Sequence, residues 1–130
     1  MIDDPIEVTG EIPAPPLRVF EAFVDAELHG AMTGGPATVE DDGSFTAWGG
    51  YIVGRTLEAL PGKKLVQTWR TSDFPESAPD SVLEIRFEPC VAGTRLTFHH
   101  RNIPKGQGPD YAQGWLDHYL APMSTWFSER

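Results

Sequence analysis

The sequence predicts an α+β fold in which a curved antiparallel β-sheet wraps around a long C-terminal α-helix, and two observations predict it. Residues 111–130 carry large apolar side chains in two neighbouring stripes at helical spacing, which together cover roughly 160° of a helix surface. A face this wide needs a broad, curved partner, and residues 37–103 supply one because their apolar and polar side chains alternate as in strands. The stripes are Trp115, Tyr119, Pro122 and Trp126, and Leu116, Leu120, Met123 and Phe127.

Residues 6–36 predict one strand followed by two short helices. Pro16 suits the first turn of a helix, where the missing N–H of proline does no harm. Asp25 can cap a second helix that runs to about Met32, and Gly34–Pro36 ends it. The apolar face of the preceding strand is formed by Ile6, Val8 and Ile12.

Residues 37–103 predict five or six strands that follow one another as an antiparallel meander. Short turn signals separate the strands, because glycine adopts positive φ and proline presets φ in tight turns. The longest irregular stretch in this region is Thr71–Pro79. The turn signals are Asp42-Gly43, Gly49-Gly50, Pro61-Gly62 and Ala92-Gly93.

The final helix is predicted to begin at Asp110, which together with Gln113 resembles a capping box. Pro122 falls inside this helix, where proline removes a backbone hydrogen bond and bends the axis. A bent helix follows a curved sheet better than a straight one, so the sheet and the helix enclose a space between them. Aromatic side chains either fill that space or leave a pocket in it.

Composition and charge favour one domain, residues 1–130, and exclude several classes of partner. Nineteen acidic against ten basic residues give a formal net charge of −9, which repels nucleic-acid backbones and anionic lipid. No apolar run approaches the roughly 18 residues of a membrane span, and the acidic N-terminus differs from a secretory signal. A single cysteine, Cys90, fits a reducing compartment. We therefore expect a cytoplasmic protein without nucleic-acid partners or membrane insertion.

The residues that most often carry catalysis or bind metals form no recognisable motif. His99 and His100 are consecutive on a predicted strand, so their side chains point to opposite faces and cannot share a metal ion. The glycines match no phosphate-binding motif, and no activated nucleophile is evident. We therefore expect no catalytic residue, no metal and no cofactor. His100 shares the parity of Phe98 and is interpreted as a hydrogen-bonded core histidine, a polar ligand contact or a general base, in that order.

Aromatic side chains are the strongest candidates for function. They form either a core rich in large side chains or an apolar pocket with a few polar groups, which is typical of a small-molecule site. In the second interpretation, the polar groups are the hydroxyls of Tyr51 and Tyr119, the guanidinium of Arg55 and the imidazole of His100. The candidate cavity residues are Trp48, Tyr51, Arg55, Trp69, Phe87, Phe98, His100, Trp115, Tyr119 and Met123.

An ordered set of short motifs extends along nearly the whole chain. The set includes Gly43-x-Phe45, Gly49-Gly50, Lys63-Lys64-Leu65-Val66, Trp69-Arg70, Ile103-Pro104 and Gly114-Trp115. With these motifs the chain resembles the C-terminal domain of the activators of the heat-shock protein 90 ATPase, within the START-like (Bet v-like, SRPBCC) superfamily. Phe74-Pro75 departs from the Trp-Pro that the family often has at this place. The resemblance implies a helix-grip fold, in agreement with the pattern of strands and helices.

The resemblance leaves three functional hypotheses open. Lipid carriers and hormone binders in the superfamily imply a non-catalytic binder of a small hydrophobic molecule. The family itself implies a partner of a heat-shock protein 90-type chaperone, although the N-terminal docking domain of the eukaryotic activators is absent from this sequence. Cyclases and aromatases in the superfamily imply an enzyme acting on a hydrophobic substrate, with Tyr51, Arg55 or His100 as polar participants. We favour the binder, and we expect a monomer or a homodimer.

Overall fold

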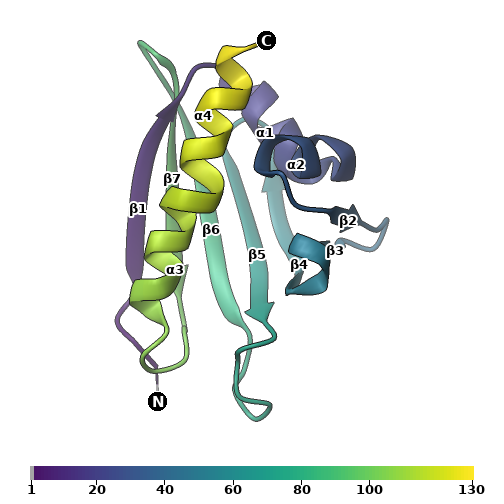
Figure 1. The fold of residues 1–130 in the computed structure, drawn as a ribbon, viewed down its shortest axis with the longest axis vertical. Helices are drawn as coiled ribbons and strands as arrows, with labels where there is room; N and C mark the ends of the chain where they lie inside the picture. Colours follow the sequence, from purple (N-terminus) through teal and green to yellow (C-terminus); the bar gives the residue numbers. More distant parts are fainter. Residues whose placement is uncertain (1) are drawn as a thin grey trace.

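The computed structural model describes residues 2–130 and shows a seven-stranded antiparallel sheet with a long helix across one face (Figure 1). The strand order is β1-β7-β6-β5-β4-β3-β2, so β2 to β7 form a continuous meander and β1 pairs with β7. The elements are β1 (Ile6–Ile12), α1 (Pro16–Val24), α2 (Ala26–Thr33), β2 (Ala37–Val39), β3 (Ser44–Ala47), η1 (Trp48–Gly50), β4 (Ile52–Leu60), β5 (Lys64–Thr71), β6 (Ser81–Cys90), β7 (Gly93–Arg101), α3 (Gly108–Gly114), η2 (Trp115–Leu120) and α4 (Ala121–Ser128).

The two predicted short helices are confirmed, and local chemistry explains where they begin and end. Pro16 is the first residue of α1. The Asp25 side chain caps α2 by accepting a hydrogen bond of 2.9 Å from the backbone N–H of Leu28. Gly34 ends α2 with a φ of 85°, which a residue with a side chain adopts only at a cost.

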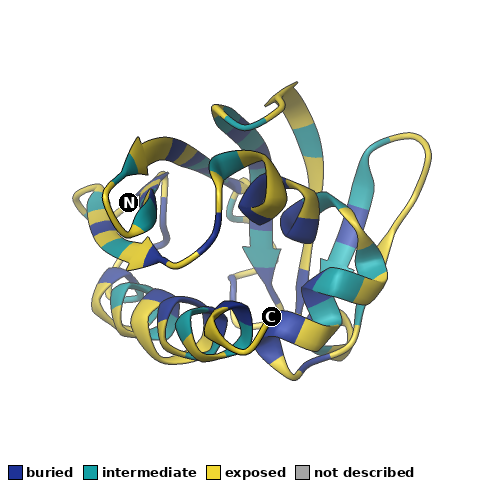
Figure 2. Cartoon of the chain, turned by 90° about the horizontal axis from the view of Figure 1, so that it is seen from above, coloured by how far each residue is buried: buried dark blue, intermediate teal, exposed yellow. Residues whose placement is uncertain are grey.

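The sheet has one buried face, and the long helix lies against it. In β5 every second residue is buried, and β6 and β7 alternate in the same way over most of their length. Seen from above, the sheet curves around one side of the molecule while the helix occupies the other (Figure 2). The predicted turns all connect neighbouring strands, and the irregular stretch after Thr71 forms the loop between β5 and β6. The predicted α+β helix-grip fold is therefore confirmed.

The C-terminal helix differs from its prediction in two details. It begins at Gly108, so the predicted capping box is wrong: Asp110 lies inside the first turn, and the Gln113 side chain donates to Asp117 at 3.0 Å. The segment η2 is a π-helix, in which the N–H of Ala121 donates to the carbonyl five residues back. Pro122 comes one residue after Ala121 and lacks the backbone N–H that would donate to the preceding turn of an α-helix. The helix is therefore wider in the turn before the proline.

The structure contains no helix, among residues 2–130, that is long and apolar enough to cross a membrane.

Candidate functional site

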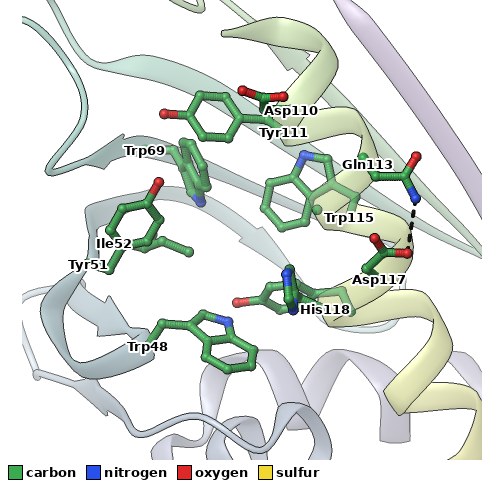
Figure 3. Close-up of a pocket in the computed structure, with 12 residues that line it drawn as sticks. Trp48, Tyr51, Ile52, Trp69, Asp110, Tyr111, Gln113, Trp115, Asp117 and His118 are labelled. Carbon is green, nitrogen blue, oxygen red and sulfur yellow. Dashed lines mark hydrogen bonds between the residues drawn. The ribbon is translucent and has the colours of Figure 1, made fainter.

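A pocket of about 430 Å³ opens between the C-terminal helix and the corner of the sheet at η1 (Figure 3). Its walls are mostly aromatic, and its carboxylates, amide and imidazole come from the helix. The corner contributes one wall, the helix contributes the opposite wall, and Trp69 of β5 lies between them. The lining residues are Trp48, Tyr51, Ile52, Trp69, Asp110, Tyr111, Gln113, Gly114, Trp115, Asp117, His118 and Tyr119.

The helix wall is fixed by stacking on the core. The ring of Trp115 stacks on Phe98 with centroids 4.5 Å apart and planes 11° apart. The ring of Tyr119 stacks on Phe23, with centroids at 5.9 Å and an interplanar angle of 4°. Stacked aromatic pairs add about 0.5–1.5 kcal/mol beyond their buried area. The two rings are therefore each held in one orientation.

A buried histidine orients the hydroxyl of Tyr119. The Nδ1 atom of His29 lies 3.2 Å from the carbonyl oxygen of Phe23, which only accepts, so this nitrogen carries the hydrogen. Burial lowers the pKa of His29, so the ring is neutral and its Nε2 accepts the hydroxyl hydrogen of Tyr119 at 2.7 Å. Burial also raises the pKa of Tyr119, so its phenol stays protonated. The sequence placed His29 only in a helical region and gave no sign of this contact.

The opposite wall depends on a strained backbone at Trp48. Its φ is 54°, in the left-handed region that non-glycine residues seldom adopt. The Trp48 indole packs edge-to-face with His118 of the helix, with centroids 5.4 Å apart. Gly35 leaves room for this indole, since a Cβ at position 35 would overlap the six-membered ring. Strain of this kind concentrates at functional sites, where the surrounding structure imposes it.

The mouth of the pocket is held by a loop that Arg70 fixes. The Tyr51 hydroxyl donates to the Asp73 carboxylate at 2.6 Å, and Asp73 belongs to the loop between β5 and β6. The guanidinium of Arg70 donates to the carbonyls of Ala78 at 2.8 Å and Pro75 at 2.9 Å in the same loop. These hydrogen bonds explain the Trp69-Arg70 motif: the tryptophan lines the pocket and the arginine orders the loop at its mouth.

The structure brings half of the predicted cavity residues together. Five of them line the pocket: Trp48, Tyr51, Trp69, Trp115 and Tyr119. Four others lie behind it in the core, at most 3% exposed, which corrects their assignment to the cavity surface: Phe87, Phe98, His100 and Met123. They lie on the same buried face of the sheet or helix as the pocket residues. Parity predicts which face a side chain occupies, but it does not predict whether that side chain reaches the pocket surface or packs behind it.

Arg55 also has to be corrected, because its side chain lies on the outer face of the sheet. It is exposed and forms an ion pair of 3.6 Å with Asp42 of the β2–β3 turn. The neighbouring residue Gly54 occupies the position of β4 that faces inward. No Cβ would fit at this position, because the Phe45 ring and a β5 carbonyl occupy the space. Arg55 is therefore not part of the proposed site.

His100 is a core histidine with both ring nitrogens engaged. Trp115 donates its indole N–H to Nδ1 at 3.3 Å. Nε2 therefore carries the hydrogen and donates to the Ser81 hydroxyl at 2.8 Å, which in turn donates to the carbonyl of Trp69. Burial lowers the pKa of His100 to about 3, so the ring is neutral. This network supports the first of the three interpretations of His100 and fixes the Trp115 ring from behind.

The sequence did not predict the polar residues that line the pocket. The apolar stripes identified the inner face of the helix, but the pocket opens along the border of that face, where polar residues lie. Helical spacing from Trp115 gives a usable signal, since positions three and four residues away flank the same surface. Within residues 2–130, no group of three or more His, Cys, Asp or Glu is placed to hold a metal ion. The residues that were missed are Ile52, Asp110, Tyr111, Gln113, Gly114, Asp117 and His118.

The chain is similar to proteins that are named as activators of a chaperone ATPase. Over 114 residues it is 29% identical to the human activator of 90 kDa heat shock protein ATPase homolog 1, covering 86% of this chain and 33% of that protein. The Dictyostelium discoideum homologue is 28% identical over 128 residues, covering 95% of this chain and 33% of the relative. The chain thus spans about a third of the length of these curated relatives.

Solved structures with the same fold agree with the sequence relatives. The structure of an HSP90 activator from Plasmodium falciparum matches with a TM-score of 0.83 and 27% identity, covering 95% of both chains. A Chromobacterium violaceum protein matches with a TM-score of 0.72 at 24% identity, covering 95% of this chain and 96% of its own, which shows the fold alone. The family model described as activator of Hsp90 ATPase homolog 1-like protein matches residues 13–126. The chain therefore belongs to the family of Hsp90 ATPase activator homolog 1-like proteins.

Proposed function

We propose that this protein binds a small hydrophobic molecule in the pocket between η1 and the C-terminal helix, without catalysing a reaction. The observation that carries the proposal is the convergence of six aromatic side chains on one space of about 430 Å³. Small-molecule sites enclose roughly 300–1,000 Å³ and are lined mainly by apolar and aromatic groups with a few polar ones. The pocket has this size and this composition.

The proposal also draws on the rigidity of the pocket. Stacking on Phe98 and Phe23 orients Trp115 and Tyr119, and hydrogen bonds hold the hydroxyls of Tyr119 and Tyr51. Side chains that are ordered before binding lose little entropy when a ligand arrives, so more of the contact energy appears as affinity. The ordered side chains therefore support a binding site rather than a core that only fills space.

Direct binding of a fluorescent probe tests the proposal. N-phenyl-1-naphthylamine is neutral and apolar, and its fluorescence rises when it leaves water. We expect saturable binding to the native protein and an affinity at least tenfold lower in the Trp48→Ala variant. Trp126→Ala is the matched control, because Trp126 packs on Phe127 and under Arg130 rather than at the pocket. Equal losses in the two variants, or no saturable binding, would contradict the proposal.

Native mass spectrometry of gently purified protein gives an independent test. A defined mass above that of the chain, which disappears on denaturation, would identify a ligand acquired in the cell. The Trp48→Ala variant should lose that adduct, whereas Trp126→Ala should keep it. An adduct that survives in Trp48→Ala lies elsewhere and would contradict the proposed site.

A second candidate function is partnership with an Hsp90-type chaperone in the cytoplasm, and the names of the relatives favour it. A purified Hsp90-type chaperone would then hydrolyse ATP faster when this chain is added. Such a function acts through the surface, so Trp48→Ala should stimulate the chaperone as well as the native chain does. Unchanged hydrolysis over a wide range of chain concentrations would count against the partnership and leave the ligand proposal standing.

A further inference from the structure

Three aromatic rings that line the pocket, those of Trp69, Trp115 and Tyr119, are tilted against one another instead of lying parallel. The planes of Trp69 and Trp115 are tilted by 51° with centroids 5.4 Å apart, and those of Trp115 and Tyr119 by 58° at 5.0 Å. Together with Trp48 and Tyr51 from the corner of the sheet, these rings surround the pocket from several sides (Figure 3). The face of an aromatic ring is electron-rich and attracts a cation within about 6 Å, tryptophan most strongly.

The tyrosine hydroxyls around the pocket add to this electron-rich character. Each of the three donates its hydrogen to another part of the protein, so it offers a ligand only oxygen lone pairs. Trp115 likewise donates its indole hydrogen, to His100. The hydroxyl hydrogens go from Tyr51 to Asp73, from Tyr111 to Gln107 and from Tyr119 to His29.

Carboxylates complete the pattern. Asp110 and Asp117 line the pocket from the helix. A second hollow of about 210 Å³ shares Tyr51, Asp110 and Tyr111 with it and brings in Asp73 at the mouth. Among the described residues that line either hollow there is no lysine or arginine. The pocket therefore combines aromatic rings, hydroxyl lone pairs and carboxylates with the amide of Gln113 and the imidazole of His118. The net charge of −9 on the chain also favours a cation.

We infer that the pocket selects an organic cation: a compact apolar molecule with a quaternary or tertiary ammonium group that contacts the tryptophan faces within reach of the Asp110 and Asp117 carboxylates. The inference rests on the proposed function and names the class of its ligand. A neutral apolar molecule would use the rings but not the carboxylates. An anion would meet the two carboxylates and, among the described lining residues, no lysine or arginine to pair with.

A pair of isosteric probes isolates the contribution of the positive charge. Choline and 3,3-dimethylbutan-1-ol have the same shape, but a carbon atom replaces the ammonium nitrogen in the alcohol. Titrations are followed by the indole N–H signals in ¹H–¹⁵N spectra, since the chain has four tryptophans. We expect choline to shift the signals of Trp48, Trp69 and Trp115 and to leave Trp126 unchanged. Its dissociation constant should be at least tenfold lower than that of the alcohol.

Charge-matched variants test where the selectivity arises. Asp110→Asn with Asp117→Asn should reduce the preference for choline to less than threefold, while the indole signals stay dispersed as in the native fold. Glu11→Gln with Glu88→Gln changes the net charge equally at exposed positions of β1 and β6. This control pair should keep the full preference, because neither glutamate lines the pocket. Salt at 0.1 M screens charges that are separated by more than about 10 Å.

Three results would overturn the inference. Equal affinities for choline and the alcohol would show that charge plays no part, and the proposed function would then stand with a neutral ligand. Saturable binding of N-phenyl-1-naphthylamine without any binding of choline would lead to the same conclusion. An equal loss of preference in both double variants would assign the selectivity to net charge rather than to the pocket. If none of the three probes binds, the proposed function fails together with the inference.

Discussion

Gly35 determines where the Trp48 indole lies, although it does not line the pocket. A Cβ at this position would overlap the ring. We expect Gly35→Ala to push the indole out of its place and to lower affinity for N-phenyl-1-naphthylamine about tenfold, as truncation of Trp48 does. In the Trp48→Ala background the same change should have no further effect on affinity, because contacting residues are coupled. Additive losses in this double-mutant cycle would show that Gly35 acts elsewhere.

The buried histidines make stability depend on pH. In the unfolded chain both His29 and His100 titrate near 6.5, whereas burial lowers the pKa of His29 and takes that of His100 to about 3. Below pH 6.5 the unfolded state therefore binds protons that the folded state does not. Stability is highest above pH 6.5 and should fall on acidification by up to about 1.4 kcal/mol per pH unit for each histidine.

Urea unfolding at several pH values between 5.0 and 7.5 measures this slope. Aspartate and glutamate titrate mostly below about 4.5 in unfolded chains, so the window from 5.0 to 6.5 reports the histidines. His100→Gln should lower overall stability, since Ser81 and Trp115 lose a partner, and should make the slope shallower. A slope that stays unchanged in this variant would mean that His100 takes up a proton in the folded state.

At the scale of elements, Arg70 organises the loop between β5 and β6. Its guanidinium donates to the Asp80 carboxylate at 2.8 Å as well as to backbone carbonyls of the loop, and lies 5.4 Å from the centre of the Phe74 ring. We expect Arg70→Ala to speed hydrogen exchange of amides 72–80 at least tenfold and to leave exchange in β6 nearly unchanged. Lysine should rescue little, because it lacks the planar fork of donors.

Arg55→Ala is the control for this prediction. Arg55 forms a single exposed ion pair with Asp42, and such pairs contribute about 0–1 kcal/mol. Hydrogen exchange in the β5–β6 loop should not change in this variant. Faster exchange in both variants would indicate a general effect of lost positive charge instead of the specific contacts of Arg70.

The order and type of the elements followed from the sequence, because alternation, helical spacing and turn residues are local signals. The details of the final helix did not follow. The π-helical turn before Pro122 depends on how the helix packs against the sheet, and the proline alone predicts only a bend. The capping box at Asp110 was mistaken because Pro109 is compatible with the first turn, so the helix begins two residues earlier.

The pocket was harder to predict than the fold. Strand and helix parity identified the inner face, and five candidate residues on it line the pocket. Parity could not separate a ring at the pocket surface from one behind it, such as Phe98, since both are buried. It also placed Arg55 wrongly, because Gly54 takes the inward position of β4 and the neighbouring Arg55 lies on the outer face. The contact between His29 and Tyr119 joins residues 90 positions apart, and no local pattern encodes it.

At the scale of the whole molecule, the excess of acidic residues affects binding of a charged ligand. A net charge of −9 surrounds the pocket with a negative potential that raises the local concentration of cations. We expect the affinity for choline to fall several-fold between about 10 mM and 200 mM salt, as screening shortens from roughly 30 Å to less than 8 Å. Affinity for 3,3-dimethylbutan-1-ol should be insensitive to salt, and a parallel decrease for both probes would contradict this expectation.

The two walls of the pocket are anchored to the molecule very differently. Trp115 and Tyr119 belong to a long helix that packs across the sheet, whereas Trp48 lies beside β2 and β3, which have only three and four residues at the edge of the sheet. Short edge strands open locally at a fraction of the global free energy of unfolding. A molecule bound as proposed should therefore dissociate at a rate set by how often this corner moves outward. Substitutions far from the pocket that stabilise the β2–β3 hairpin should slow that dissociation while every contact in the pocket stays the same.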